Sequence, residues 1–358
     1  DIVFRMLISY LRKNLWERQA FVFILTVFAQ CLIVPAAYSQ QKLAQSGFQF
    51  LSVGTDARAT GMGEAFTTIE GSSAALFYNP AGIASINSLD LSGSQMKWIA
   101  DIKYLSGSAA FAPYEGKYGV VGISFLKVDY GKFNFTRVAQ NEQGFEDVKD
   151  WPQPAAYVVG FGYGRALSDH FSVGGQVKYA YQSLGMSIVP VYTKVLVDSA
   201  TVRTDTALVE RDYSLNVLAF DFGTIYRTGL KSLAFGMSIT NFSRELKYER
   251  ESFQLPLTFK ICLSMNIMDL MPAIAEEHAL FISVDAVHPR SYYEYLNIGG
   301  EYVFMNTIIF RAGYITHHTE YNLTAGLGVR KLGIAVDYSL MPIKVFNHIH
   351  RLSVRFSL

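Results

Sequence analysis

Apolar and polar positions alternate along most of the chain after about residue 88. In segment 257–267, for example, the odd positions are apolar and the even positions are small or polar. Successive residues of a β-strand point to opposite faces. Each such segment is therefore predicted to be a strand between an apolar and a wet environment.

A soluble β-sandwich would show the same alternation locally, but the length of the segments favours a membrane barrel. They run for about 10 to 13 residues, whereas soluble strands usually have five or six, and a tilted strand needs about this length to cross a bilayer. Charged residues lie almost only on the polar face or in connections. Because lipid cannot satisfy an open sheet edge, such strands must close into a barrel.

Fourteen segments fit this description, which is an even number, as expected for a bacterial barrel. The candidate strands are 89–99, 104–113, 118–130, 155–167, 170–182, 213–227, 232–241, 256–268, 278–287, 294–304, 306–316, 321–330, 332–341 and 348–358. The last is expected to close the barrel against the first. The predicted fold is therefore all-β, a 14-stranded antiparallel transmembrane β-barrel, and residues 89–358 are assigned to it.

The connections between these segments alternate in length, which predicts the orientation of the barrel. Short turns follow the second, fourth, sixth, tenth and twelfth strands, and long loops at 131–154, 183–212 and 242–255 follow the third, fifth and seventh. Bacterial barrels have short periplasmic turns and longer outer loops. The exception is 269–277, which is interpreted as a helical turn on the periplasmic side.

Residues 1–39 have the pattern of a signal peptide. Four basic residues precede an apolar stretch at 21–34, and Ala37 and Ser39 provide a small-residue cleavage site. The alternative is an uncleaved signal anchor, since 20–38 has barely the length to span a bilayer. Cleavage after Ser39 would remove Cys31 and leave Cys262 alone, so no disulfide within the mature chain is expected.

Residues 40–88 do not alternate and are predicted to form a plug in the barrel lumen. Small residues dominate this stretch, as expected for a segment packed inside a wall. Asn79 is suited to cap a short helix that begins at Pro80, a favoured pairing at helix starts. The fold class thus includes an N-terminal lumen plug or hatch.

The plug carries two motifs that resemble a known family. They are 56–65, DARATGMGEA, and 79–82, NPAG. Together they resemble the N-terminal signature of the PorV/PorQ family, outer-membrane barrels of the FadL-like superfamily. The residues that carry the resemblance are Asp56, Arg58, Gly61, Gly63, Asn79, Pro80, Ala81 and Gly82.

The resemblance implies fourteen strands, an N-terminal hatch, and the outer membrane of a Gram-negative, Bacteroidota-like bacterium. It also implies a role in type IX protein secretion, with secreted cargo proteins or subunits of the secretion machinery as partners.

Several charged residues occupy the alternate positions of their predicted strands that carry small or polar side chains. These positions are expected to face the lumen. They are Lys178, Lys260, Asp285, Glu301, Arg311, Arg330, Asp337 and Arg355. Two interpretations remain open, a network of paired charges that holds the plug against the wall, or a polar conduit. No local arrangement of Ser and His indicates catalysis, so an enzyme is not expected. No cofactor and no metal site are expected either.

Composition narrows the choice of function without deciding it. The chain has 31 Lys+Arg and 30 Asp+Glu, and only 17% of its residues are charged, so it lacks the basic surplus of a nucleic-acid binder. Three functions remain: a secretion-associated barrel that handles protein cargo, a FadL-like channel for hydrophobic small molecules, or a purely structural protein surrounded by outer-membrane lipid. The aromatic and apolar residues of loops 131–154 and 183–212 suit either of the first two.

Overall fold

The structure is a computed structural model that describes residues 46–138, 142–148, 151–198, 201–270, 278–317, 321–344 and 348–358. The predicted signal peptide at 1–39 lies outside the described residues. So do residues 40–45 of the predicted plug, and residues 271–277 of the predicted periplasmic helical turn, of which the 3₁₀ turn Ile267–Leu270 is described. Among the helices of the described part, none is long and apolar enough to cross a membrane.

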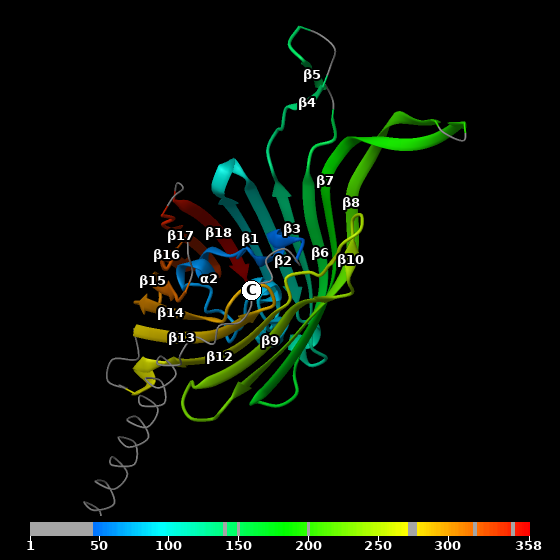
Figure 1. The fold of residues 1–358 in the computed structure, drawn as a ribbon. Helices are drawn as coiled ribbons and strands as arrows, with labels where there is room; N and C mark the ends of the chain where they lie inside the picture. The colour runs from blue at the N-terminus through cyan, green and yellow to red at the C-terminus, as the bar shows by residue number, and fades with distance from the viewer. Residues whose placement is uncertain are drawn as a thin grey trace, which may run out of the picture. The chain divides into compact units, whose positions relative to one another are not determined.

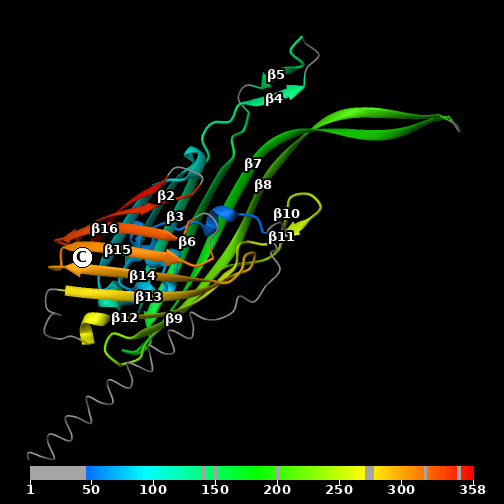
Figure 2. The same cartoon turned by 60° about the vertical axis from the view of Figure 1, so that its left-hand side comes forward.

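Fourteen antiparallel strands form a closed barrel, which confirms the predicted fold class (Figures 1 and 2). The wall strands are β1 (Leu89–Lys97), β2 (Lys103–Phe111), β3 (Val120–Asp129), β6 (Ala155–Ala166), β7 (Phe171–Asp198), β8 (Thr201–Arg227), β9 (Ala234–Ser243), β12 (Thr258–Asn266), β13 (His278–Pro289), β14 (Tyr295–Phe304), β15 (Ile308–Ile315), β16 (Leu323–Lys331), β17 (Ile334–Met341) and β18 (Ile349–Ser357). The last strand pairs with the first, as expected, with Leu91 opposite Phe356.

The two faces of the wall differ as the alternation predicts. On β18, Leu352 and Val354 are exposed on the outside, whereas Arg351 and Ser353 are buried inside. The same alternation of exposed and buried positions runs through β3, β15, β16 and β17. The outer face is therefore an apolar belt suited to lipid, and the inner face carries the charged and hydroxyl groups.

The long loops contain more regular structure than the sequence suggested. Loop 131–154 includes the hairpin β4 (Phe135–Val138) and β5 (Phe145–Val148), and loop 242–255 includes β10 (Leu246–Lys247) and β11 (Ser252–Phe253). All of these lie at the end of the barrel that carries the longer connections. By the loop-length rule this is the outer end, and the short turns face the periplasm.

The prediction of a loop at 183–212 is wrong, because most of these residues belong to strands β7 and β8. β7 and β8 have 28 and 27 residues and stay paired to Leu196 and Val202, so the hairpin continues beyond the barrel (Figure 1). The stretch from Ile188 to Val197 is rich in β-branched residues, which favour strands. A membrane crossing uses only about ten residues, and the sequence pattern gave no reason to extend the strands further.

Residues 46–88 lie inside the wall, and we call them the plug. The plug contains η2 (Gln49–Ser52), α2 (Ala57–Gly61), η3 (Ser73–Phe77) and η4 (Pro80–Ser85). Most of its residues from Thr55 to Ile83 are buried. Figures 1 and 2 show this blue segment enclosed by strands from both halves of the chain.

Candidate functional site: the contact between plug and wall

The plug crosses the lumen from the outer end to the periplasmic end. At the outer end the Gly47 amide donates to the Gln254 carbonyl, 3.1 Å away, in the loop between β9 and β12. At the other end Ala112, in the turn between β2 and β3, donates to the Ser88 carbonyl at 2.7 Å. The plug thus contacts the wall over the whole depth of the barrel.

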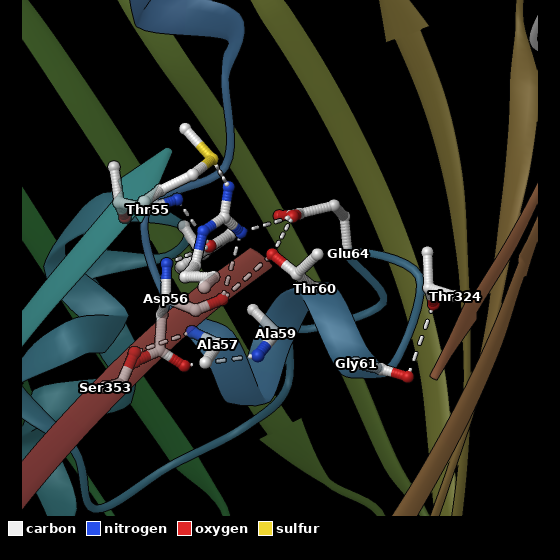
Figure 3. A network of polar contacts seen from close by, with 12 residues as sticks. Thr55, Asp56, Ala57, Ala59, Thr60, Gly61, Glu64, Thr324 and Ser353 are labelled. Atoms are coloured by element: carbon white, nitrogen blue, oxygen red, sulfur yellow. Dashed lines mark hydrogen bonds and ion pairs between the residues drawn. The ribbon is translucent and has the colours of Figure 1, made fainter. Parts of the chain in front are cut away.

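Helix α2 is held by hydrogen bonds at both of its ends (Figure 3). The Asp56 carboxylate caps it by accepting from the Ala59 amide at 3.1 Å, which is the usual role of an Asp at this position. The Ala57 amide donates to Ser353 Oγ of β18 at 2.8 Å, and Thr324 Oγ1 of β16 donates to the Gly61 carbonyl at 3.3 Å. A helix this short gains its stability from such tertiary contacts.

Four charged residues, here called the central quartet, join α2 to three strands. Arg58 donates from Nε and Nη2 to the two oxygens of Glu301, at 2.7 and 2.6 Å. Arg311 donates from Nε to Glu301 at 2.6 Å and from Nη1 to Asp337 at 2.7 Å. Two positive charges thus balance two negative ones, and three of the four residues are predicted lumen charges.

The strand register explains why the quartet can form. Glu301 and Arg311 are directly opposite on β14 and β15. To reach Asp337 on β17, the Arg311 side chain crosses β16 at Gly328, where an added Cβ would lie 2.3 Å from Asp337 Oδ1 and 2.8 Å from Arg311 Nη1. The alternation of glycines on β16 therefore opens the path that the arginine uses.

Two titratable groups of the plug have shifted pKa values that follow from their burial and neighbours. Burial alone would lower the pKa of the Arg58 guanidinium, but the Glu301 carboxylate more than offsets this and the pKa is raised. Burial, and then the Glu64 carboxylate, raise the pKa of Tyr78. The Tyr78 hydroxyl stays protonated while its oxygen accepts from the Thr55 and Asp56 amides at 3.1 and 3.2 Å.

A second ion pair fixes the periplasmic half of the plug. Arg355 donates from Nε to Asp90 Oδ2 at 2.6 Å and from Nη2 to the Gly71 carbonyl, so it reaches both a lumen carboxylate and a plug carbonyl. Asp90 Oδ1 also accepts from the Ser73 amide at 2.6 Å. Asp90 was not predicted as a site residue, although it is the single acidic residue on the inner parity of β1.

Lys178, Lys260 and Asp285 are the remaining predicted lumen charges that lie at the inner face. Lys178 pairs with Asp221 at 2.7 Å, a wall-to-wall contact. Lys260 Nζ lies 5.7 Å from the centre of the Tyr78 ring. Asp285 Oδ2 accepts from the Thr67 amide and from Thr67 Oγ1, at 3.2 and 2.5 Å.

Arg330 has the expected parity but does not belong to the network. Its side chain is exposed near the end of β16, and it forms no ion pair with another described residue. Parity alone could not show that this position lies below the plug. Arg351 is the complementary case: it is fully buried on β18, donates to the Asp56 carbonyl at 3.3 Å, and lies 3.5 Å from Glu64.

The NPAG motif forms a helix start that is wedged against the wall. Asn79 Oδ1 caps η4 by accepting from the Ala81 amide at 3.1 Å, and Pro80 is its first residue, as predicted. Asn79 Nδ2 donates to the carbonyls of Thr67 and Thr224, at 2.7 and 3.2 Å. One amide side chain thus joins two parts of the plug to strand β8.

Replacing Asn79 by Ala should lower the free energy of unfolding by about 2–3 kcal/mol, because the cap and the two carbonyl contacts are lost together. The measurement is the urea midpoint of the folded form, followed by heat-modifiable mobility on gels. Ser85→Ala is the matched control, since this η4 hydroxyl has no hydrogen-bond partner among the described residues. Equal midpoints for the two variants would contradict the assigned role.

Glycines on the inner wall let the plug backbone approach closely. A Cβ at Gly313 would lie 2.1 Å from the Gly63 nitrogen, and one at Gly174 would lie 2.4 Å from the Ala81 nitrogen. Gly63 itself has φ of 63°, a conformation that glycine adopts without strain. Gly82 similarly leaves only 2.6 Å between an added Cβ and the Ile69 carbonyl.

The outer half of the lumen is apolar and is filled by the first residues of the plug. Phe48 and Phe50 are buried there, and Phe48 also packs against Phe253 of the outer loop. The wall around them belongs to the same apolar cluster, which we call the outer chamber; its buried members include Met96, Tyr104, Leu126, Val158, Val217, Leu255 and Ile349. Lower down, a gap between the plug and β1–β2 has no room for a water molecule.

No protein-family model and no curated protein sequence matches the chain. Among solved structures, the toluene transporter TodX of Pseudomonas putida is similar, with 11% identity, a TM-score of 0.48, and coverage of 83% of this chain and 95% of TodX. The outer membrane protein Omp33 of Acinetobacter baumannii gives 7% identity, a TM-score of 0.42, and coverage of 77% of this chain and 100% of Omp33.

Identities and TM-scores this low assign neither a family nor a function. The location follows from the wall itself, since a closed barrel with an apolar outer face leaves no unpaired strand edge in lipid. The chain is an outer-membrane β-barrel of a Gram-negative bacterium, with a plug in its lumen.

Proposed function

We propose that this barrel is a non-enzymatic, PorV/PorQ-like component of type IX secretion that binds protein cargo or a machinery subunit at the outer surface. The observation that carries the proposal is the extended β7–β8 hairpin. The signature residues of the plug, from Asp56 to Gly82, support the same assignment by resemblance.

The hairpin offers two strand edges for protein binding. β6 pairs with β7 only as far as Ser183, and β9 pairs with β8 only from Ala219 onward. Beyond these points each strand has one edge without a paired strand among the described residues, and on β7 the Trp151 indole N–H donates to the Met186 carbonyl at 2.9 Å. Exposed edges of this kind bind extended segments of other proteins by adding a strand to the sheet.

The plug favours binding at the surface over passage through the lumen. The central quartet, the Arg355–Asp90 pair and the Asn79 contacts join it to strands around the barrel. Because the charges in these contacts are paired and mostly buried, withdrawing the plug would expose several unpaired charges at once. The paired-charge interpretation is thus preferred to that of a polar conduit.

Shortening the β7–β8 hairpin is expected to abolish attachment of cargo to the cell surface. The variant replaces residues 188–210 by Asn-Gly, which joins the opposite residues Ser187 and Arg211 with a tight turn. The amount of surface cargo is measured by mass spectrometry, and the amount of folded barrel by heat-modifiable mobility. The control shortens the β4–β5 hairpin, which has its own two-stranded sheet. Normal surface cargo in the β7–β8 variant would contradict the proposal.

A second function is favoured by the outer chamber. Its apolar lining suits a hydrophobic small molecule of the kind that FadL-like channels pass, provided that Phe48 and Phe50 move aside. Deletion of the gene separates the two functions. Loss of surface proteins supports the secretion role, whereas loss of growth on hydrophobic carbon sources with normal surface proteins supports the channel.

A further inference from the structure

The periplasmic turns share a feature that neither function explains. Each of five short turns carries at least one large apolar side chain that is exposed to the surroundings, and the turn of Tyr114 carries a second, Tyr118. We call the five the apolar collar; they are Tyr114 (80% exposed), Leu167 (59%), Leu230 (52%), Met305 (57%) and Leu332 (89%). Single exposed apolar residues are ordinary, but one in every short turn around a closed barrel is a pattern.

Three of these side chains occupy backbone positions that do not suit them. Tyr114, Met305 and Leu332 have φ of 51°, 49° and 52°, in the left-handed region. Hairpin turns usually place Gly, Asn or Asp there, because a bulky residue is strained in this conformation. Strain at such positions points to a function that the side chain performs outside the turn.

At two turns the collar adjoins apolar residues of the lipid-facing belt, while exposed charged residues, Arg165 before Leu167 and Arg330 and Lys331 before Leu332, lie at the same edge. Phe304 and Ile308 are opposite each other and flank Met305. At the next turn, Ile334 follows Leu332 by two residues and is exposed on the same outer face. The collar therefore lies at the edge of the belt, where the acyl chains meet the headgroups.

Charge next to the collar fits phospholipid headgroups. Lys117, Lys231 and Lys331 are exposed and lie within three residues of a collar side chain. Long lysine side chains can lie along an apolar surface while the ammonium group reaches a phosphate. Three of the five turns thus combine an exposed apolar side chain with a lysine, and two turns also carry an exposed acid, Glu115 or Asp169. The apolar and basic groups match a lipid surface, which surrounds the barrel on all sides.

We propose that the apolar collar inserts into the inner leaflet of the outer membrane and, with its neighbouring lysines, binds phospholipid headgroups. The collar sets the depth of the barrel and holds its periplasmic end in the lipid. This proposal does not depend on whether the outer surface handles cargo or the lumen passes a hydrophobic compound.

Fluorescence quenching tests the depth of the collar directly. Leu332→Cys is labelled with bimane in a Cys31→Ser, Cys262→Ser background and folded into phosphatidylcholine vesicles. Lipid brominated near the headgroup end of the acyl chain should remove most of the emission, whereas iodide in the water should remove little. The matched control is a label at Glu146→Cys in the β5 segment, where iodide should quench and brominated lipid should not. A label at 332 that behaves like the label at 146 would overturn the proposal.

The headgroup contact has its own test. A Lys117→Gln, Lys231→Gln, Lys331→Gln variant and the unmodified chain are folded into phosphatidylcholine vesicles with and without phosphatidylglycerol. The unmodified chain should fold faster when phosphatidylglycerol is present, and the triple variant should lose this advantage. An advantage that survives the three substitutions would refute the lysine contact, and the folded triple variant excludes a general folding defect.

Discussion

Replacement of Arg311 by Met is expected to destabilise the folded barrel by about 3–5 kcal/mol, because it leaves a buried carboxylate without its partner. Arg311 and Asp337 are both buried, and no other cation is within ion-pair distance of Asp337 among the described residues. The urea midpoint of the heat-modifiable form is the measurement. Protease cleavage within the plug should increase in parallel, since the quartet holds α2 to the wall.

A second substitution makes this test specific for charge. Arg311→Met combined with Asp337→Asn leaves Arg58 and Glu301 as a neutral pair, so the double variant should recover much of the lost stability. Arg137→Met is the control for a surface ion pair, since Arg137 and Glu146 are both exposed, and its midpoint should hardly change. If the double variant is as unstable as the single one, the quartet acts through packing and not through paired charge.

Valine at Gly313 and Gly174 is expected to displace the plug while leaving the wall closed. At both positions the added Cβ would meet plug backbone within 2.4 Å, and backbone cannot rotate away as a side chain can. Overpacking of this kind costs about 1–3 kcal/mol per site. Since the clash is with the plug alone, the strain is relieved when the plug leaves the lumen.

Ion conductance in planar bilayers measures this outcome. The unmodified barrel should show little conductance and the Gly313→Val, Gly174→Val variant should show stable open channels. Gly93→Val is the matched control, because an added Cβ at this strand glycine has no atom of the described residues within 4 Å. A variant that is folded and remains closed would show that the plug can shift within the lumen to accept the extra atoms.

The wall could be predicted from the sequence because lipid imposes one strict rule on it. Where one face of a strand is apolar and the other is small or polar, as in β16 and β17, the alternation predicts both the residues of the strand and which of its side chains face the lipid. Asp221 of β8 was missed because its inward neighbours, Val217 and Ala219, are as apolar as the lipid-facing residues. Where apolar and polar positions do not alternate, the sequence does not show which face of the strand a single aspartate occupies.

The site was predictable in its residue types and not in its pairings. Parity placed Glu301, Arg311 and Asp337 on the inner face, but the bridge across β16 depends on register between strands, which no local pattern contains. Arg58 was singled out by resemblance, and its partner Glu301 lies 243 residues away. Arg330 shows the converse limit, since parity does not tell how deep in the barrel a residue lies.

The direction of the plug determines the order in which the molecule can be assembled. Ser46 bridges to Gln254 at the outer mouth, and the chain reaches the periplasmic rim only at Leu89. A segment that traverses the whole barrel cannot be pushed in afterwards from below; the wall has to be built around it. The closing strand β18 presents Arg351, Ser353 and Arg355 to residues that are already in place, Asp56, Ala57 and Asp90. The plug residues that meet β18 therefore guide closure of the wall, and a chain that lacks Asp56 and Ala57 should stall as an open sheet before its two edges meet. The Gly174→Val, Gly313→Val chain keeps both residues and can close.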